Sequence, residues 1–196
     1  MNNKANKVKF DLKNVHYAKI TGFAEDGTPT YAKPVRYPGA VSLSLSPSGE
    51  PETFWADGEA YYVTNNNYGY EGDYESAMVP ESFATDILGE NSDENGVLVE
   101  NANAELSSFA LLFEFVGDTK KIRHVMYNCT ASRANVESST KEESIEVKTD
   151  TITLTAKPLS NGLVKARTGD STSDDIYNGW YTEVYMPVVD KTVATK

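Results

Sequence analysis

The stretch AVSLSLS, residues 40–46, decides the fold class, because apolar and polar residues alternate along it without a break. Side chains on a β-strand point alternately to its two faces, so Val41, Leu43 and Leu45 are expected on a buried face and the serines in solvent. The pattern predicts a half-buried strand. It also indicates that the surrounding chain builds sheets, since similar patterns recur on both sides of it.

Turn signals separate these strand-like runs. Asp26-Gly27 and Asp57-Gly58 are tight-turn pairs, and the second lies between the runs TFWA and AYYVT, which predicts a hairpin. Further strands are expected at 14–20, 106–117, 121–133 and 144–158, the last with Ile145, Val147 and four threonines on one side. We find no internal repeat and no linker composition.

The chain of 196 residues is therefore expected to form one mainly β domain over residues 1–196. The spacing of the strands is typical of two packed antiparallel sheets, as a β-sandwich or partly open barrel of about eight to ten strands. The ends, about 1–13 and 187–196, are expected to be arms.

One segment departs from the β pattern, VPESFATDILGE at residues 79–90. Pro80 suits the first helical position, Phe83 and Ile87 share a face, and Gly89 is a natural left-handed stop. The segment predicts one short α-helix over about 80–88. Because a sheet must bury its apolar face and cover its edges, we expect this helix to flank the sheet as a lid.

The charge of the chain is unevenly distributed. The net charge is -11, yet residues 1–36 carry seven basic groups against three acidic ones, whereas residues 37–119 carry sixteen acidic groups and no Lys or Arg. Such a balance argues against a nucleic-acid reader, which needs a basic surface. Two interpretations stay open. Acidic and basic regions could meet within one molecule, or the acidic region could meet another copy or repel polyanions.

Residues that would suggest catalysis or metal binding are few. Cys129 is the single cysteine, so an intramolecular disulfide and a cysteine-cluster metal site are excluded, and we expect a small buried hydrophobe. His16 and His124 stand in no metal or catalytic spacing and are expected to be structural. The segment 91–96, NSDENG, starts like a calcium loop, but the twelfth position is Ala102 rather than glutamate, so we expect a plain loop. We expect no enzyme activity, no cofactor and no metal.

The chain shows no targeting or membrane signal. Its first residues, MNNKANKVKF, contain no apolar core of a signal peptide, and no apolar run approaches a membrane span. We therefore expect synthesis in a cytoplasm.

Aromatic residues gather in a turn-rich stretch from Pro47 to about Tyr74. They suit a platform on which carbohydrate stacks, and equally an interface between subunits, where Tyr and Trp are enriched. Several of them would also suit the core. The candidates are Trp55, Tyr61, Tyr62, Tyr68 and Tyr70.

Ten segments follow one another along the chain in an order that resembles a known family. They are NVHYA, PGAVSLSLSPSGE, FWADGEAYYV, NNNYGYEGDYE, VPESFATDILGE, VLVENANAE, FALLFEFVGD, RHVMYNCTASR, KEESIEVKTDTITLTAKP and GLVKARTG. Together they resemble the major tail protein of long-tailed bacteriophages of Gram-positive bacteria, the phi13-type tail tube family. The resemblance covers the chain from about Val8 to Pro187.

This resemblance implies a structural protein of the virion, made in the cytoplasm of the host bacterium. Such proteins form hexameric rings that stack head-to-tail into a hollow tube, and DNA passes through the lumen without specific binding. The fold has two packed sheets and one flanking helix, and sheets of six subunits join into an inner barrel. The other implied partners are the tape-measure protein, the tail terminator and the distal tail proteins.

The resemblance also implies roles for the acidic region and for the aromatic stretch. A long loop and the terminal arms of such proteins make the contacts between rings, and we assign residues 47–74, with the five aromatic candidates, to that loop. The acidic region would line the lumen and repel phosphates, or pair with the basic N-terminal region of a neighbour. The alternatives are a carbohydrate-binding module, which would be a stable monomer, and a hydrolase, which would need an acid pair or a histidine triad.

Overall fold

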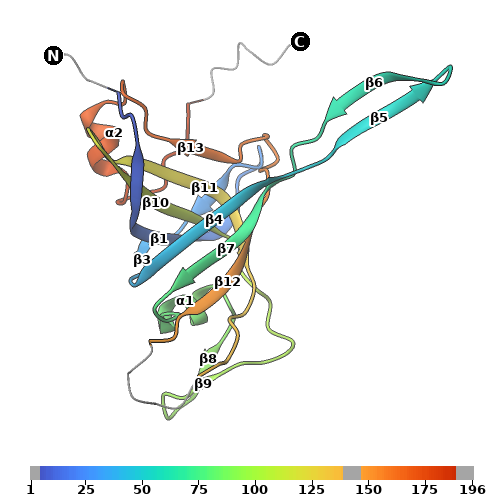
Figure 1. Ribbon diagram of the computed structural model, residues 1–196. Helices are drawn as coiled ribbons and strands as arrows, with labels where there is room; N and C mark the ends of the chain where they lie inside the picture. The colour runs from blue at the N-terminus through green and yellow to red at the C-terminus, as the bar shows by residue number, and fades with distance from the viewer. Residues whose placement is uncertain (1–4, 139–146, 189–196) are drawn as a thin grey trace.

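The computed structural model describes residues 5–138 and 147–188 (Figure 1). The main sheet contains β1 (Lys9–Phe23), β2 (Pro29–Tyr31), β3 (Val35–Arg36), β4 (Ala40–Ser48), β7 (Gly69–Ser76), β10 (Phe109–Gly117), β11 (Ile122–Ala131), β12 (Asp150–Ala156) and β13 (Lys165–Arg167). Two hairpins stand apart from it, β5 (Pro51–Ala56) with β6 (Glu59–Asn65) and β8 (Asn91–Ser92) with β9 (Leu98–Val99). The helices are α1 (Glu81–Asp86) and α2 (Asp174–Gly179).

The main sheet is antiparallel and curls upon itself. Its strand order is β2-β1-β10-β11-β12-β7-β4, with β3 added to β1 and β13 added to β11. The curl brings β4 near β1, but no hydrogen-bonded ladder joins the two among the described residues. The mainly β fold and the partly open barrel are thus confirmed, with one continuous sheet supplying both packed halves.

The inner face of the curl holds the larger core. On β10 the alternate residues Phe109, Leu111 and Phe113 point inward and pack with Tyr74 of β7 and Ile152 of β12. Through these contacts β10 links the two halves of the curled sheet across its interior. These five side chains, each at most 4% exposed, belong to the larger apolar cluster, and its burial stabilises the fold.

The outer face of β1, β10 and β11 is also covered, by the C-terminal segment, residues 159–186. Ala110 and Leu112 of β10 point outward and pack with Leu159 and Trp180 of that segment. The indole Nε1 of Trp180 donates a hydrogen bond to the backbone oxygen of His124 at 3.2 Å. Coverage on both faces explains why the run FALLF is apolar throughout rather than alternating.

Helix α1 lies within the predicted range of 80–88 and closes one end of the curl (Figure 1). Phe83 meets the rings of Tyr17, Tyr37 and Phe109 edge-on, at centroid distances of 5.1, 5.0 and 5.3 Å. The helix ends at Asp86 with Ile87 as its C-cap, and Gly89, predicted as the stop, adopts a left-handed φ of 76° two residues beyond that cap. The predicted lid is therefore present, but Pro80 is the N-cap with an extended backbone, not the first helical residue as predicted.

Two details differ from the prediction. A bulge between Ala40 and Ser42 in the β4–β7 ladder breaks the alternation, so Ala40 packs on the core and Val41 is exposed. Strand β12 begins at Asp150, not at 144, since its partner β7 ends opposite that residue. Residues 144–146 of the predicted strand lie outside the described residues, and Val147 is exposed.

The ends of the described chain are partly anchored. Residues 1–4 and 189–196 of the predicted arms lie outside the described residues. Asn6 accepts hydrogen bonds from the backbone N–H groups of Thr119 and Lys120 at 2.8 Å each, and β1 begins at Lys9. Neither helix of the described chain could cross a membrane.

Candidate functional site

The hairpin of β5 and β6 projects from the body of the molecule (Figure 1), and we call residues 49–68 the arm. Its strands continue the β4–β7 pair beyond the last matched residues, Ser48 and Gly69. Asp57 and Gly58 have φ angles of 53° and 80°, as a type I′ turn requires, so the predicted hairpin is confirmed. At about 3.3 Å a residue the arm reaches roughly 30 Å from the sheet.

Gly49 sits where the arm leaves the sheet. Its φ is 136°, and a Cβ at this position would collide with the backbone oxygen of Asn66 on the returning strand. Only glycine combines that dihedral with so close an approach of two backbones. The residue therefore determines how the arm continues from β4.

Four of the five predicted aromatic residues are exposed on the arm. The exposed fractions are 65% for Trp55, 73% for Tyr61, 62% for Tyr62 and 58% for Tyr68. Their alternative place in the core is thereby excluded. The fifth, Tyr70, is half-buried in β7 at the base of the arm, and the ammonium of Lys165 lies 4.2 Å from its ring centroid.

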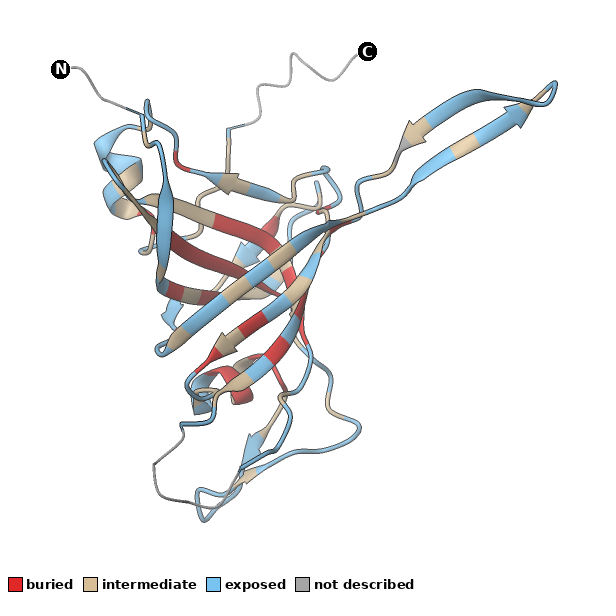
Figure 2. Cartoon of the chain, viewed as in Figure 1, coloured by how far each residue is buried: buried red, intermediate tan, exposed pale blue. Residues whose placement is uncertain are grey.

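Apolar side chains occupy both faces of the arm. Phe54 lies opposite Tyr62 and shares one face with it, while Val63 lies opposite Thr53 on the other face. Phe54 is 62% exposed and was not among the predicted residues; a register shift between Phe54 and Trp55 gives it Tyr62 as its partner, where the turn alone would have given Tyr61. None of the described residues in the arm is buried (Figure 2). A two-stranded hairpin with apolar side chains on both faces is marginal alone and marks an interaction site.

A second surface lies on the outer face of β4, β7 and β12, where no other part of the described chain forms a covering layer. Glu71, Asp73 and Glu75 form a row along β7, and we call them, with their neighbours on the two adjoining strands, the acidic face. These neighbours are Ser42, Ser44 and Ser46 on β4 and Thr151, Thr153 and Thr155 on β12.

Hydroxyl groups hold the carboxylates of the acidic face in position. Ser42 donates to Glu75 Oε2 at 3.0 Å, and Thr149 donates to Glu75 Oε1 at 2.6 Å. Thr153 donates to Asp73 Oδ1 at 3.0 Å. No ion pair in the described part of the chain involves the three acids, so their negative charge remains available to act on an approaching polyanion.

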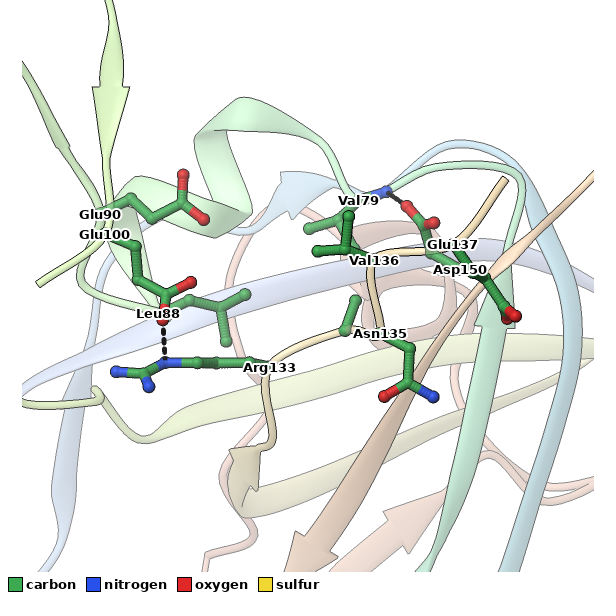
Figure 3. Close-up of a pocket in the computed structure, with 10 residues that line it drawn as sticks. Val79, Leu88, Glu90, Glu100, Arg133, Asn135, Val136, Glu137 and Asp150 are labelled. Atoms are coloured by element: carbon green, nitrogen blue, oxygen red, sulfur yellow. Dashed lines mark hydrogen bonds and ion pairs between the residues drawn. The ribbon is translucent and has the colours of Figure 1, made fainter. Parts of the chain in front are cut away.

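A shallow pocket of about 260 Å³ beside α1 is a weaker candidate (Figure 3). Two of its carboxylates are already engaged, since Glu100 pairs with Arg133 at 3.1 Å and Asp150 accepts a hydrogen bond from the backbone of Val79 at 2.8 Å. Figure 3 shows Glu90 and Glu100 on one side of the pocket and Asp150 on the other. Among the described residues no three His, Cys, Asp or Glu side chains converge as a metal site.

The predicted structural residues occupy structural positions. His16 packs beside Tyr181 on the outer face of the sheet, whereas His124 stacks on Phe113 on the inner face, so the two histidines share no site. Cys129 is fully buried, and burial raises the pKa of its thiol to about 12. In the segment 91–96 the Asp93 carboxylate accepts backbone hydrogen bonds from the loop itself, which lowers its pKa.

No protein-family model matches this chain, and no curated protein matches it.

Proposed function

We propose that this protein is a structural subunit of a bacteriophage tail tube. It assembles into hexameric rings that stack into a hollow tube, and DNA passes through that tube from capsid to host cell. The observation that carries the proposal is the arm, which reaches roughly 30 Å from the sheet and presents Phe54, Trp55, Tyr61 and Tyr62 with no cover from the rest of the described chain. In a stack of rings, a neighbouring subunit would cover the exposed side chains of the arm.

The open sheet supports the same proposal. Strand β4 ends the strand order, and one of its two edges has no hydrogen-bonded partner among the described residues. Long free edges invite association, and closing a ring of subunits removes them. Joining β4 of one subunit to the sheet of the next would build a continuous inner wall.

The acidic face suits the surface of that wall. Its three carboxylates and six flanking hydroxyls form a polar, negatively charged surface without Lys or Arg. Such a surface repels phosphates, so DNA slides along it and does not adhere. We therefore assign the acidic face to the lumen, and the arm to contacts between rings.

Negative-stain electron microscopy of the purified protein tests the proposal. Images are collected across a series of protein and salt concentrations, with light scattering on the same samples. Rings or hollow tubes are expected, alone or after addition of a distal tail complex as nucleator. A monomer under every condition, with and without that complex, would overturn the proposal and favour a binding module.

A further inference from the structure

Within residues 5–138 and 147–188, no helix or loop closes the end of the curled sheet opposite α1. Phe83 seals the end near Phe109, where β10 begins, but the inner face near Phe115, where β10 ends, opens into a groove of about 330 Å³. We call this opening the groove. Its apolar lining consists of Leu43, Leu45, Tyr70, Phe113, Phe115 and Met126. An opening into a core this rich in aromatic rings invites an apolar occupant.

The groove is also positively charged. Lys165 and Arg167 of β13 lie opposite Met126 and His124 of β11, which puts the two cations on the inner face. The ammonium of Lys9 lies 4.9 Å from the ring centroid of Phe115 at the opening. No ion pair in the described part of the chain uses Lys9, Lys165 or Arg167. Burial is the main cause that lowers the pKa of His124, and the nearby cations Arg167, Lys9 and Lys165 lower it further, so positive charge is concentrated here.

The arm has the complementary chemistry. It carries exposed aromatic side chains and the four acids Glu50, Glu52, Asp57 and Glu59, with no Lys or Arg. None of these acids takes part in an ion pair in the residues that the structure describes. An apolar and negative hairpin therefore matches an apolar and positive groove, as specific interfaces require.

The groove that receives the arm belongs to another molecule. The arm points away from its own sheet (Figure 1), and its tip is roughly 30 Å from the nearest strand of that sheet. A contact between an arm and a groove on different molecules is heterologous, and such contacts repeat head-to-tail without limit.

We propose that the arm of each copy docks into the groove of the next copy, with Phe54, Trp55 or Tyr62 covering the exposed end of the core and the arm carboxylates meeting Lys9 and Lys165. This inference rests on the proposed function and names the surface that receives the arm.

A charge exchange between two full-length variants tests the contact. One variant reverses the groove, Lys9→Glu with Lys165→Glu, and the other reverses the arm, Glu50→Lys with Glu52→Lys and Glu59→Lys, because three such changes are needed to turn the four negative charges of the arm into a net positive charge. Sedimentation velocity measures self-association of each variant and of their equal mixture. Each variant alone should associate at least about tenfold more weakly than the wild type, and the mixture should recover most of the loss, since every arm then meets a groove of opposite charge.

The controls are Lys33→Glu and Glu25→Lys, which make the same kind of charge change at exposed sites and should leave association unchanged. Circular dichroism confirms the fold of each variant, and Arg167→Glu is a second groove variant if Lys165→Glu unfolds. Unchanged association of either reversed variant, a mixture that does not recover, or a wild type that never associates would overturn the contact.

Electron microscopy of the same samples separates the two proposals. Rings or tubes formed equally by the wild type and both reversed variants would leave the tail tube standing and remove the arm–groove contact. Recovery of association in the mixture, with no ring or tube in any sample, would support the arm–groove contact and remove the tail tube.

Discussion

Arg123 and Glu114 lie directly opposite each other on neighbouring strands, and Arg123 Nε donates to Glu114 Oε2 at 3.3 Å. The Glu114 side chain is fully buried and also pairs with Lys121 Nζ at 2.7 Å. Asn14 Nδ2 and the Tyr181 hydroxyl donate to the same carboxylate, at 2.9 and 3.4 Å. Since Tyr181 belongs to the C-terminal segment, this cluster fastens that segment to the sheet.

Replacing Glu114 by Gln should destabilise the protein strongly. The change leaves Arg123, whose side chain is 15% exposed, without its counter-charge, and removing one partner of a buried pair costs about 3–5 kcal/mol. Urea denaturation at neutral pH measures the loss. Asp11→Asn is the control, because it breaks only a solvent-exposed pair with Lys13 and should cost far less stability than Glu114→Gln. Equal losses in both variants would contradict the role of the buried cluster.

Phe83→Ala should open the end of the core that α1 closes. The ring is 1% exposed and contacts three other aromatic rings, so its removal should cost about 3–5 kcal/mol. Thermal and chemical denaturation measure this loss. Glu81→Gln changes an exposed residue of the same helix and should cost less than about 0.5 kcal/mol. A small effect of Phe83→Ala would mean that the helix is dispensable as a lid.

The stability of the protein should fall in acid partly because of His124. Burial, aided by Arg167, Lys9 and Lys165, lowers its pKa from 6.5 to about 4. Between these values the unfolded chain binds a proton that the folded chain does not. His124 therefore costs no stability above about pH 6.5, and the stability lost through it grows as the pH falls toward 4. It should reach about 2–3 kcal/mol of lost stability.

His124→Phe should remove this part of the pH dependence, because phenylalanine can stack on Phe113 without taking up a proton. Urea denaturation between pH 7 and pH 4 compares the slopes of stability against pH for the two proteins. Lys33→Gln at an exposed site should keep the wild-type slope. A variant slope equal to that of the wild type would assign the acid sensitivity to other groups.

Substitutions on the arm should impair assembly without lowering the stability of the subunit. The triple change Phe54→Ser, Trp55→Ser and Tyr62→Ser removes exposed side chains, so the stability of the subunit should shift by less than about 1 kcal/mol. Rings should no longer stack, because the apolar contacts of the arm are lost. Electron microscopy and light scattering follow assembly, and Phe23→Ser with Val97→Ser, exposed elsewhere, should assemble normally. Normal tubes from the triple variant would show that the arm is not a stacking contact.

Reversing the acidic face should make the lumen retain DNA. Assembled tubes of Glu71→Lys, Asp73→Lys and Glu75→Lys are expected to bind a labelled 30-base-pair duplex at least about tenfold more tightly than wild-type tubes at low salt. Fluorescence anisotropy across a salt series measures binding. The triple variant Glu25→Lys, Glu94→Lys and Glu105→Lys changes the net charge equally at other exposed sites. Equal binding by the two variants would remove the acidic face from the lumen.

Features with local causes could be predicted from the sequence. The position of α1 follows from Pro80, the face shared by Phe83 and Ile87, and Gly89, although the helix itself is shorter, Glu81–Asp86. The β5–β6 hairpin follows equally from Asp57-Gly58 and its flanking strands. Local signals of this kind need no knowledge of the partner strands.

Features that depend on a partner strand could not be predicted. The exposure of Val41 depends on a bulge in the ladder with β7, and the start of β12 at Asp150 depends on where β7 ends. The groove is lined by residues from six strands, so no single short segment of the sequence predicts it. Glu114 did have a signal, since one acid within an apolar strand needs a cation on the neighbouring strand.

The two tryptophans of the chain occupy opposite environments, and each can therefore serve as an intrinsic fluorescent reporter of one event. Trp55, at 65% exposed, should emit at long wavelength and shift to the blue when the arm becomes covered. Trp180, at 2% exposed, should shift to the red only when the C-terminal segment leaves the sheet. In a Trp55→Phe variant the emission then follows unfolding alone, and in Trp180→Phe it follows association alone, without any attached dye.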